Sequence, residues 1–169
     1  MKLVILAGGY GSRLGEVTSL VPKPMVEIGG KPILWHIMKI YSHYGIKEFV
    51  ICLGYKAHII KEYFLHYKER NSDFTINYED DSIEFHNNHN EKDWKVTLVD
   101  TGLDSLKGAR LKKVEKFLED DVNLLTYGDG LANININNLV DFHLRMGKIV
   151  TISGVHPPAR FGELQADGD

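Results

Sequence analysis

The fold of this chain is decided near its N-terminus, by the stretch Leu3-Val4-Ile5-Leu6-Ala7-Gly8-Gly9-Tyr10-Gly11-Ser12-Arg13-Leu14. Its first four residues form a continuous apolar run, which predicts a strand buried on both faces, as in a parallel sheet. The glycines that follow allow the backbone to approach a ligand closely and to point successive amides at phosphate oxygens. Because ligands of open α/β sheets bind outside the carboxyl ends of the strands, this loop is a candidate phosphate-binding site.

Two common phosphate motifs do not fit this loop. A dinucleotide fingerprint that begins at Gly9 requires glycine or alanine at position 14, where a leucine stands. A Walker A loop requires a Gly-Lys-Ser/Thr triplet, and none follows. Arg13 in the same loop can contact phosphate through two parallel hydrogen bonds. The alternative, a plain glycine-rich turn, accounts for the glycines but gives the arginine no use.

Beyond the loop, the spacing of apolar residues predicts alternating strands and helices. Residues 32–44 carry apolar side chains on one helical face, with Pro32 suited to the first position and Gly45 to the stop. Residues 49–53 predict a second buried strand, and residues 59–67 repeat the helical spacing. Strand, helix, strand and helix in succession favour βαβ units under a parallel sheet.

The pattern changes in the middle of the chain. Apolar and polar residues alternate over 74–78, 83–85 and 94–98, which predicts antiparallel, half-exposed strands with a turn at 79–81. The other predicted elements are a helix at 109–118, a strand at 122–127, a helix at 136–146 capped by the asparagines before it, and a strand at 149–155. We therefore expect an α/β fold with a mainly parallel sheet and a small antiparallel β insertion.

Length and composition fit one globular domain. The 169 residues carry 20 basic and 23 acidic side chains, a net charge of −3, so we expect no nucleic-acid partner. No apolar stretch reaches the ~20 residues of a membrane span, and the N-terminus is too short for a signal-peptide core. The single cysteine, Cys52, falls in an apolar run and predicts a buried core residue. These features predict a cytoplasmic protein without membrane partners.

Two further segments supply candidate site residues. Lys23 lies between two prolines, which we expect to hold it in an extended conformation as a positioned charge for a phosphate. Taken alone, such a segment is more typical of a surface loop. Asp129 lies between two glycines after a predicted strand, where its carboxylate can hold Mg²⁺ together with substrate phosphates. A simple turn explains Gly-Asp-Gly equally well, and a second acidic ligand has to come from elsewhere.

Taken together, these motifs resemble the signature of the sugar-1-phosphate nucleotidylyltransferase family. The signature is Leu-Ala-Gly-Gly-x-Gly-Ser-Arg-Leu at 6–14 followed by Lys-Pro-Met at 23–25. The members that use CTP and glucose 1-phosphate are the most similar, through matches at 23–38, 52–56, 99–102, 126–130 and 161–162. The resemblance implies one Rossmann-like nucleotidyltransferase domain over residues 1–169, with the family's sugar-phosphate-binding part missing after it.

The resemblance also implies roles for individual residues. Nucleotide contacts are implied for Leu6, Ala7, Gly8, Gly9 and Tyr10 at the base and ribose, for Gly11, Ser12 and Arg13 at the phosphates, and for Ser105, Arg110 and Gly128. Arg13 and Lys23 would be the catalytic residues, because they would stabilise the leaving pyrophosphate and the entering phosphate. Asp129 would bind the cofactor, Mg²⁺, beside the α-phosphoryl group.

The implied reaction is Mg²⁺-dependent transfer of CMP from CTP to α-D-glucose 1-phosphate, which gives CDP-glucose and pyrophosphate. Positioning and charge neutralisation suffice for such an in-line transfer, without a covalent intermediate. The family further implies a homo-oligomer and a role in making sugars for bacterial surface polysaccharide, the O-antigen of lipopolysaccharide. Two alternatives stay open: the same reaction with UTP or dTTP, and a nucleotide-binding module without activity.

Overall fold

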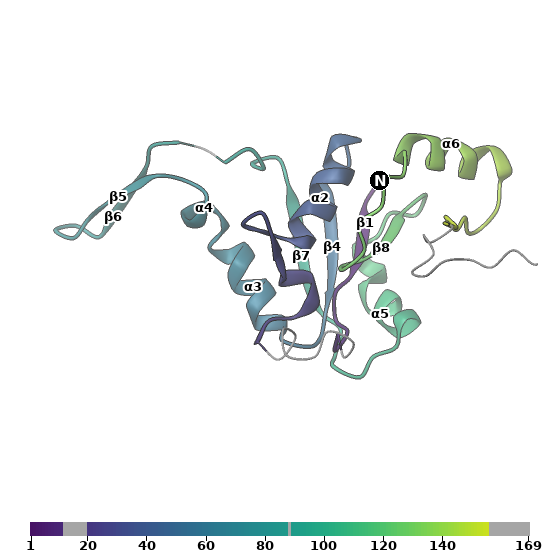
Figure 1. The fold of residues 1–169 in the computed structure, drawn as a ribbon, viewed down its shortest axis with the longest axis horizontal. Helices are drawn as coiled ribbons and strands as arrows, with labels where there is room; N and C mark the ends of the chain where they lie inside the picture. Colours follow the sequence, from purple (N-terminus) through teal and green to yellow (C-terminus); the bar gives the residue numbers. More distant parts are fainter. Residues whose placement is uncertain (12–19, 88, 156–169) are drawn as a thin grey trace, which may run out of the picture. The chain divides into compact units, whose positions relative to one another are not determined.

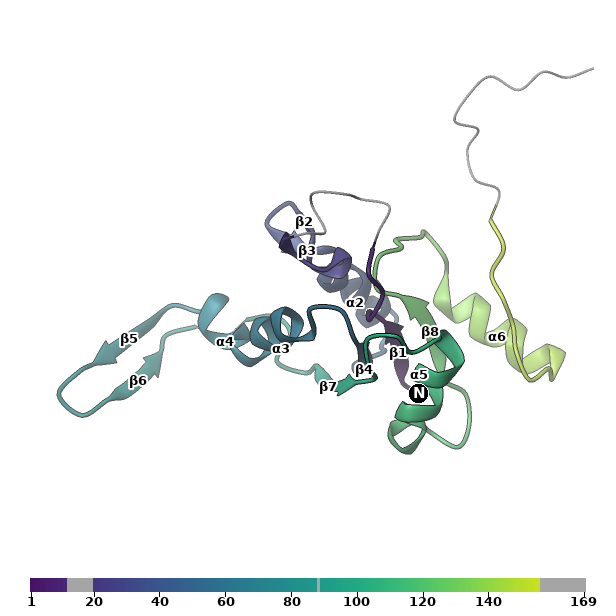
Figure 2. The same cartoon turned by 90° about the horizontal axis from the view of Figure 1, so that it is seen from below.

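The computed structural model describes residues 1–11, 20–87 and 89–155, which fall into two compact units (Figures 1 and 2). The first unit is Met1–Ala132 and the second begins at Asn133. Ser12 and Arg13, two of the predicted phosphate contacts, lie outside the described residues. Within those three ranges, no helix combines the length and the apolar character needed to cross a membrane.

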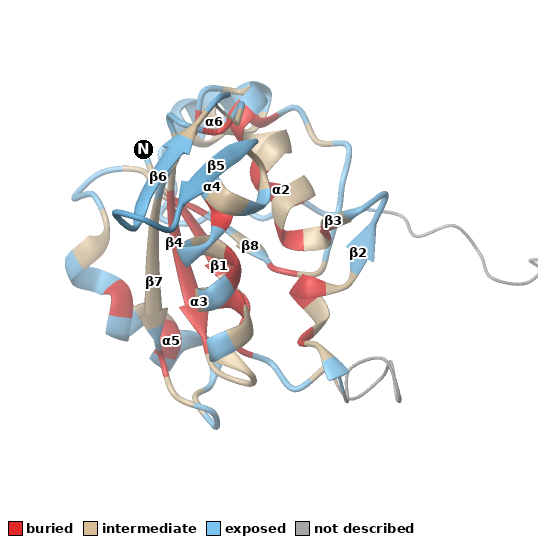
Figure 3. Cartoon of the chain, turned by 90° about the vertical axis from the view of Figure 1, so that its left-hand side faces the viewer, coloured by how far each residue is buried: buried red, intermediate tan, exposed pale blue. Residues whose placement is uncertain are grey.

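A four-stranded sheet, in which every neighbouring pair of strands is parallel, forms the centre of the first unit. Its order is β7-β4-β1-β8, and the strands are β1 (Leu3–Leu6), β4 (Glu48–Leu53), β7 (Lys95–Asp100) and β8 (Leu124–Tyr127). The central strands β1 and β4 are the most buried (Figure 3). Continuous apolar runs are what strands covered on both faces require, and the expected α/β fold with a mainly parallel sheet is confirmed.

Helices cover both faces of this sheet. They are α2 (Ile33–His43), α3 (Ala57–Leu65), α4 (Tyr67–Arg70) and α5 (Lys107–Val114), and α5 continues into the short 3₁₀ turn η3 (Glu115–Phe117). On one face, Val4 and Cys52 pack against Val114 of α5. On the other face lies α2, where the Tyr41 hydroxyl bonds to the side chain of Thr126 in β8. α2, α3 and α5 match segments with predicted helical spacing, whereas α4 shares only Tyr67 with such a segment.

Two antiparallel hairpins complete the first unit. One joins β2 (Glu27–Ile28) to β3 (Lys31–Pro32) through Gly29 and Gly30, whose φ values of +59° and +75° suit a tight hairpin turn. The other joins β5 (Phe74–Asn77) to β6 (Ser82–Phe85) and confirms the antiparallel insertion predicted there. In Figure 1 the β5–β6 hairpin extends away from the four-stranded sheet. The β2–β3 hairpin was not predicted from the sequence.

The strand predicted over 94–98 exists, but its predicted antiparallel direction is wrong. It is β7, which runs parallel to β4 and pairs with it from Lys95 to Asp100. Because β7 is at the edge of the sheet, most of its side chains are half-buried. A half-buried edge strand and a hairpin strand produce the same alternation of apolar and polar residues, so the alternation carried no information on direction.

The described part of the second unit contains one helix, α6 (Ile136–Met146), at the bounds that the sequence predicts. The Asn135 side-chain oxygen caps it by accepting from the Asn138 amide at 3.0 Å, and Gly147 ends it with a φ of +55°. The strand predicted at 149–155 is wrong, because none of these residues is in a strand. Apolar side chains there are exposed, and a strand needs a neighbour for its backbone hydrogen bonds.

Candidate functional site

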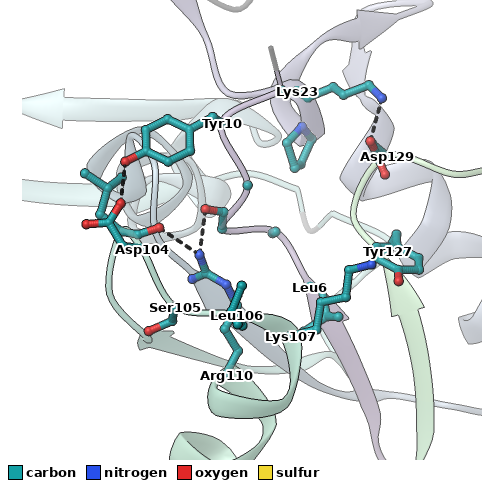
Figure 4. Close-up of a pocket in the computed structure, with 16 residues that line it drawn as sticks. Leu6, Tyr10, Lys23, Asp104, Ser105, Leu106, Lys107, Arg110, Tyr127 and Asp129 are labelled. Atoms are coloured by element: carbon teal, nitrogen blue, oxygen red, sulfur yellow. Dashed lines mark hydrogen bonds and ion pairs between the residues drawn. The ribbon is translucent and has the colours of Figure 1, made fainter. Parts of the chain in front are cut away.

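A pocket of about 430 Å³ lies at the carboxyl ends of β1 and β8 (Figure 4). Its walls are the glycine-rich segment after β1, the start of the Lys-Pro-Met segment, the loop before α5 and the end of β8. A cavity of this volume suits a small-molecule ligand. The pocket brings together the predicted site residues Leu6, Ala7, Gly8, Gly9, Tyr10, Gly11, Lys23, Ser105, Arg110 and Asp129.

The glycine-rich segment forms one wall of this pocket. The Gly8 carbonyl accepts a hydrogen bond from the Tyr55 amide at 3.2 Å, which ties the segment to the loop after β4. Gly8 has no room for a side chain, because a Cβ there would lie 2.2 Å from a guanidinium nitrogen of Arg110. Gly11 has a φ of +69°, in the left-handed region that favours glycine. The contacts of this segment with phosphate stay a prediction.

Arg110, at 6% exposure, is a buried cation in the pocket wall. Its guanidinium donates at 2.7–3.0 Å to the carbonyls of Leu53, Gly8, Gly102 and Leu103 and to the hydroxyl of Thr101. These acceptors follow, or end, the strands β1, β4 and β7, so one side chain holds together three segments at the carboxyl edge of the sheet. The predicted contact of Arg110 with a nucleotide stays a prediction, since its hydrogen bonds here are all to the protein.

One end of the pocket is closed by a contact between Tyr10 and Asp104 (Figure 4). The Tyr10 hydroxyl donates to Asp104 Oδ1 at 2.8 Å, and the Tyr10 ring lies 5.4 Å from the ring of Tyr55. The hydrogen bond to the carboxylate, with smaller contributions from burial and the negative charge, raises the pKa of Tyr10 above its usual value. Tyr10 therefore keeps its proton at neutral pH and remains a donor to Asp104.

The opposite end of the pocket holds an ion pair between Lys23 and Asp129. Lys23 Nζ lies 2.6 Å from Asp129 Oδ2, and the two side chains are 31% and 33% exposed. Lys23 begins the 3₁₀ turn η2 (Lys23–Met25), in which the Met25 amide donates to the Pro22 carbonyl at 2.8 Å. The predicted extended conformation of Lys23 is therefore wrong. Proline fixes φ near −65°, a value that both conformations share, so the flanking prolines did not determine the backbone at Lys23.

Asp129 lies two positions after the end of β8, and its carboxylate is suited to bind Mg²⁺. The Gly128 amide donates to the Leu6 carbonyl at 2.9 Å, and a Cβ on Gly128 would lie 3.0 Å from the Pro24 ring, so glycine lets the two segments approach. Among the described residues, no three or more His, Cys, Asp or Glu side chains lie together so that they could hold a metal ion. A lone carboxylate at a pocket edge fits Mg²⁺ that takes its other oxygen ligands from phosphates and water.

Six residues of the pocket wall were not predicted from the sequence: Pro24, Leu103, Asp104, Leu106, Lys107 and Tyr127. Three of them lie between β7 and α5, and the rule that ligands bind beyond the carboxyl ends of parallel strands applies to that loop as well. The rule does not extend to a loop after an antiparallel strand, which is what the alternation at 94–98 predicts, whereas β7 is parallel. Lys107 and Tyr127 face each other, with the Lys107 ammonium 5.3 Å from the centre of the Tyr127 ring.

The profile of the nucleotidyl transferase family matches residues 2–169. The chain belongs to this family. This match and the relatives described below together confirm the predicted resemblance to sugar-1-phosphate nucleotidylyltransferases. The pocket at the carboxyl edge of the sheet is the candidate nucleotide site of a nucleotidyltransferase.

Relatives named as nucleotidylyltransferases agree with this membership. The chain is 54% identical over 165 residues to glucose-1-phosphate cytidylyltransferase of Salmonella typhimurium, which covers 97% of this chain and 64% of the relative. It is 44% identical over 167 residues to the probable glucose-1-phosphate cytidylyltransferase of Bacillus subtilis, covering 99% of this chain and 65% of the relative. The chain thus spans slightly less than two-thirds of the length of these relatives.

Solved structures share the fold. HddC from Yersinia pseudotuberculosis, complexed with GMP-PN, has a TM-score of 0.61 and 26% identity, over 85% of this chain and 54% of that one. UDP-glucose pyrophosphorylase complexed with UDP-glucose has a TM-score of 0.60 over 86% of this chain and 54% of that one. At 16% identity, the second similarity is one of fold alone.

Proposed function

We propose that the protein transfers CMP from CTP to α-D-glucose 1-phosphate and so makes CDP-glucose and pyrophosphate. The observation that carries the proposal is the Lys23–Asp129 pair beside a glycine-rich wall, in a chain 54% identical to a glucose-1-phosphate cytidylyltransferase. Nucleotidyl transfer uses a positioned cation, a carboxylate that binds a metal ion, and a backbone that phosphates can approach closely.

In this proposal the triphosphate lies toward Lys23 and Asp129. An oxygen of the sugar phosphate forms a bond to the α-phosphorus, and the bond from that phosphorus to the bridging oxygen breaks, releasing pyrophosphate. Lys23 turns its ammonium from Asp129 to the entering phosphate and stabilises its negative charge. Arg13, which lies outside the described residues, is assigned to the leaving pyrophosphate.

Asp129 is the proposed protein ligand of Mg²⁺, which when bound neutralises charge on the phosphates. Its carboxylate already holds the Lys23 ammonium at 2.6 Å, and no acidic cluster of the described residues assists it. We therefore expect the free chain to bind Mg²⁺ weakly and CTP to tighten that binding, because triphosphate oxygens add ligands.

The choice of nucleotide is tested by incubating the longest natural form of the protein with glucose 1-phosphate, Mg²⁺ and CTP, UTP or dTTP in turn. Release of pyrophosphate measures turnover, and CTP is expected to give the highest kcat/KM. A preference for UTP or dTTP overturns the cytidine assignment. Binding of CTP without any turnover favours the alternative of a nucleotide-binding module.

The metal assignment predicts that Asp129→Asn removes most of the turnover while the protein stays folded. Asparagine keeps the backbone preferences of the Gly-Asp-Gly corner but loses the charge that binds Mg²⁺. The expected fall in kcat is at least about a hundredfold, measured at limiting Mg²⁺ with circular dichroism to verify folding. Normal turnover of this variant would show that Gly-Asp-Gly is only a turn.

The proposal extends to the setting of the enzyme. We propose a homo-oligomer in the cytoplasm whose product supplies sugars for bacterial surface polysaccharide. These points derive from the family resemblance described above. Light scattering of the purified protein tests the oligomer, since a monomer at micromolar concentration contradicts it.

A further inference from the structure

Asp104 is a carboxylate in the pocket wall that the proposed reaction does not use. It is exposed, and it lies in the loop between β7 and α5. Its Oδ1 accepts the Tyr10 hydroxyl at 2.8 Å. Among the described residues, its second oxygen has no hydrogen-bond partner, so this oxygen is an acceptor available to a ligand.

The neighbouring polar side chains at this end of the pocket are already engaged within the protein. The Ser105 hydroxyl donates to the Thr101 carbonyl at 2.5 Å and accepts from the Lys113 ammonium at 3.0 Å. The Arg110 guanidinium is occupied by acceptors of its own chain. Asp104 is therefore the side chain at this end that is best placed to offer a new hydrogen bond.

The two ends of the pocket differ in chemistry, and this difference orients a nucleotide. The Lys23–Asp129 end supplies the cation and the metal ligand that a triphosphate requires. Figure 4 shows Asp104 and Tyr10 across the pocket from that pair. The Asp104 end also carries the apolar side chains of Leu103 and Leu106, which suit the faces of a planar base.

We propose that Asp104 selects the base of the nucleotide by accepting a hydrogen bond from its exocyclic amine. Cytosine carries an amino donor at C4, where uracil and thymine carry a carbonyl oxygen. A carboxylate bonds to the first and repels the second, so Asp104 favours CTP over UTP and dTTP. This inference rests on the proposed function, because it takes the pocket to be the nucleotide site.

Tyr10 is the positioning residue in this arrangement. Its hydroxyl holds one oxygen of Asp104, and its ring lies against that of Tyr55, so the second oxygen has a fixed direction. The contact joins the glycine-rich segment to a loop 94 positions away. Removal of the Tyr10 hydroxyl leaves the carboxylate in place but frees it to rotate.

The experiment measures the dissociation constants of CTP and UTP by calorimetry for the wild type, Asp104→Asn, Asp104→Ser and Tyr10→Phe. The control is Asp121→Asn, which makes the same charge change at an exposed position outside the pocket wall. We expect Asp104→Asn and Asp104→Ser to lower the preference for CTP over UTP by about tenfold or more. Tyr10→Phe should lower it less, and the control not at all.

The outcomes separate this inference from the proposed function. A wild type that prefers CTP, with an unchanged preference in both folded Asp104 variants, overturns the role of Asp104 and leaves the proposed function standing. A wild type that binds neither nucleotide, or prefers UTP, overturns both. An equal loss of CTP and UTP affinity in the Asp104 variants shows a general effect on the pocket and also overturns base selection.

Discussion

Two cations in the pocket wall, Arg110 and Lys23, are placed in very different surroundings. Arg110 is buried, and its guanidinium donates to five acceptors of its own chain. Lys23 is about one-third exposed and has a single ion pair, with Asp129. Both were expected to contact the nucleotide. The structure separates a cation with many buried hydrogen bonds from one with a partly exposed ion pair.

The difference follows from the cost of burying a charge. A buried guanidinium is tolerated because hydrogen bonds replace its hydration, and the carbonyls of Gly102 and Leu103 in turn depend on Arg110 for their donor. A lysine that is about one-third exposed keeps part of its hydration, so its partner can be exchanged at small cost. The surroundings of each cation thus predict which substitution affects folding and which affects the ligand alone.

The largest expected effect is that of Arg110→Met on stability. The substitution keeps an unbranched side chain but removes the donor that the carbonyls of Gly102 and Leu103 have in the described structure. The Leu53 and Gly8 carbonyls lose one donor each and keep the amides of Thr101 and Tyr55. We expect the free energy of unfolding to fall by about 2–4 kcal/mol, because each of the two part-buried carbonyls left unpaired costs roughly 1–3 kcal/mol. Urea unfolding followed by circular dichroism measures it. A loss below about 1 kcal/mol would show that Arg110 is not a scaffold residue.

Cys52 provides a second, local measure of the same scaffold. Burial raises the pKa of its thiol from 9.0 to about 11, and the positive charge of Arg110 lowers this pKa by a smaller amount. At about pH 8 the thiolate fraction is then roughly a hundredfold below that of an exposed cysteine, so a thiol reagent should label the native protein at least that much more slowly than the unfolded chain.

The Cys52 experiment also tests the scaffold itself. The Arg110 guanidinium donates to the Leu53 carbonyl, next to Cys52, so Arg110→Met should open this edge more often and speed labelling. Lys23→Met is the control and should leave the labelling rate unchanged.

The pH dependence of the free energy of unfolding has a definite sign. The unfolded thiol of Cys52 loses its proton near pH 9 and the folded one near pH 11, so stability falls as pH rises through this range.

Most of the fold was predictable because its central elements have unambiguous patterns. β1 and β4 are buried on both faces and therefore appear as uninterrupted apolar runs, and α6 has both a polar cap and a terminal glycine. The direction of β7 was not predictable, because it depends on a partner that alternation does not specify. The strand predicted at 149–155 failed for the same reason, since a strand exists only with a neighbour.

The site was predictable where it depends on chain-local geometry. A glycine-rich loop after a buried strand, and an acidic residue after another, must meet at the same edge of a parallel sheet. The environment of Arg110 was not predictable, because its bond to Gly8 spans 102 positions of sequence. The same holds for the contact of Tyr10 with Asp104. Residue type suggested ligand binding, and only the fold showed which groups are already occupied.

The smallest expected effect is that of Lys23→Met on stability, which completes the comparison. Half-exposed ion pairs contribute little, because water solvates both charges when the pair is broken. We expect the free energy of unfolding to change by less than about 1 kcal/mol in urea, under the conditions used for Arg110→Met. CTP affinity, measured by calorimetry on the same sample, should nevertheless fall by about tenfold or more, since a charge-assisted contact to phosphate is lost.

A loss of stability equal to that of Arg110→Met would make Lys23 a second scaffold cation, and unchanged CTP affinity would remove its assignment to the phosphates. If stability is retained while affinity is lost, the ion pair with Asp129 is a resting contact that a phosphate replaces, and burial, rather than residue type, decides the role of each cation in this pocket.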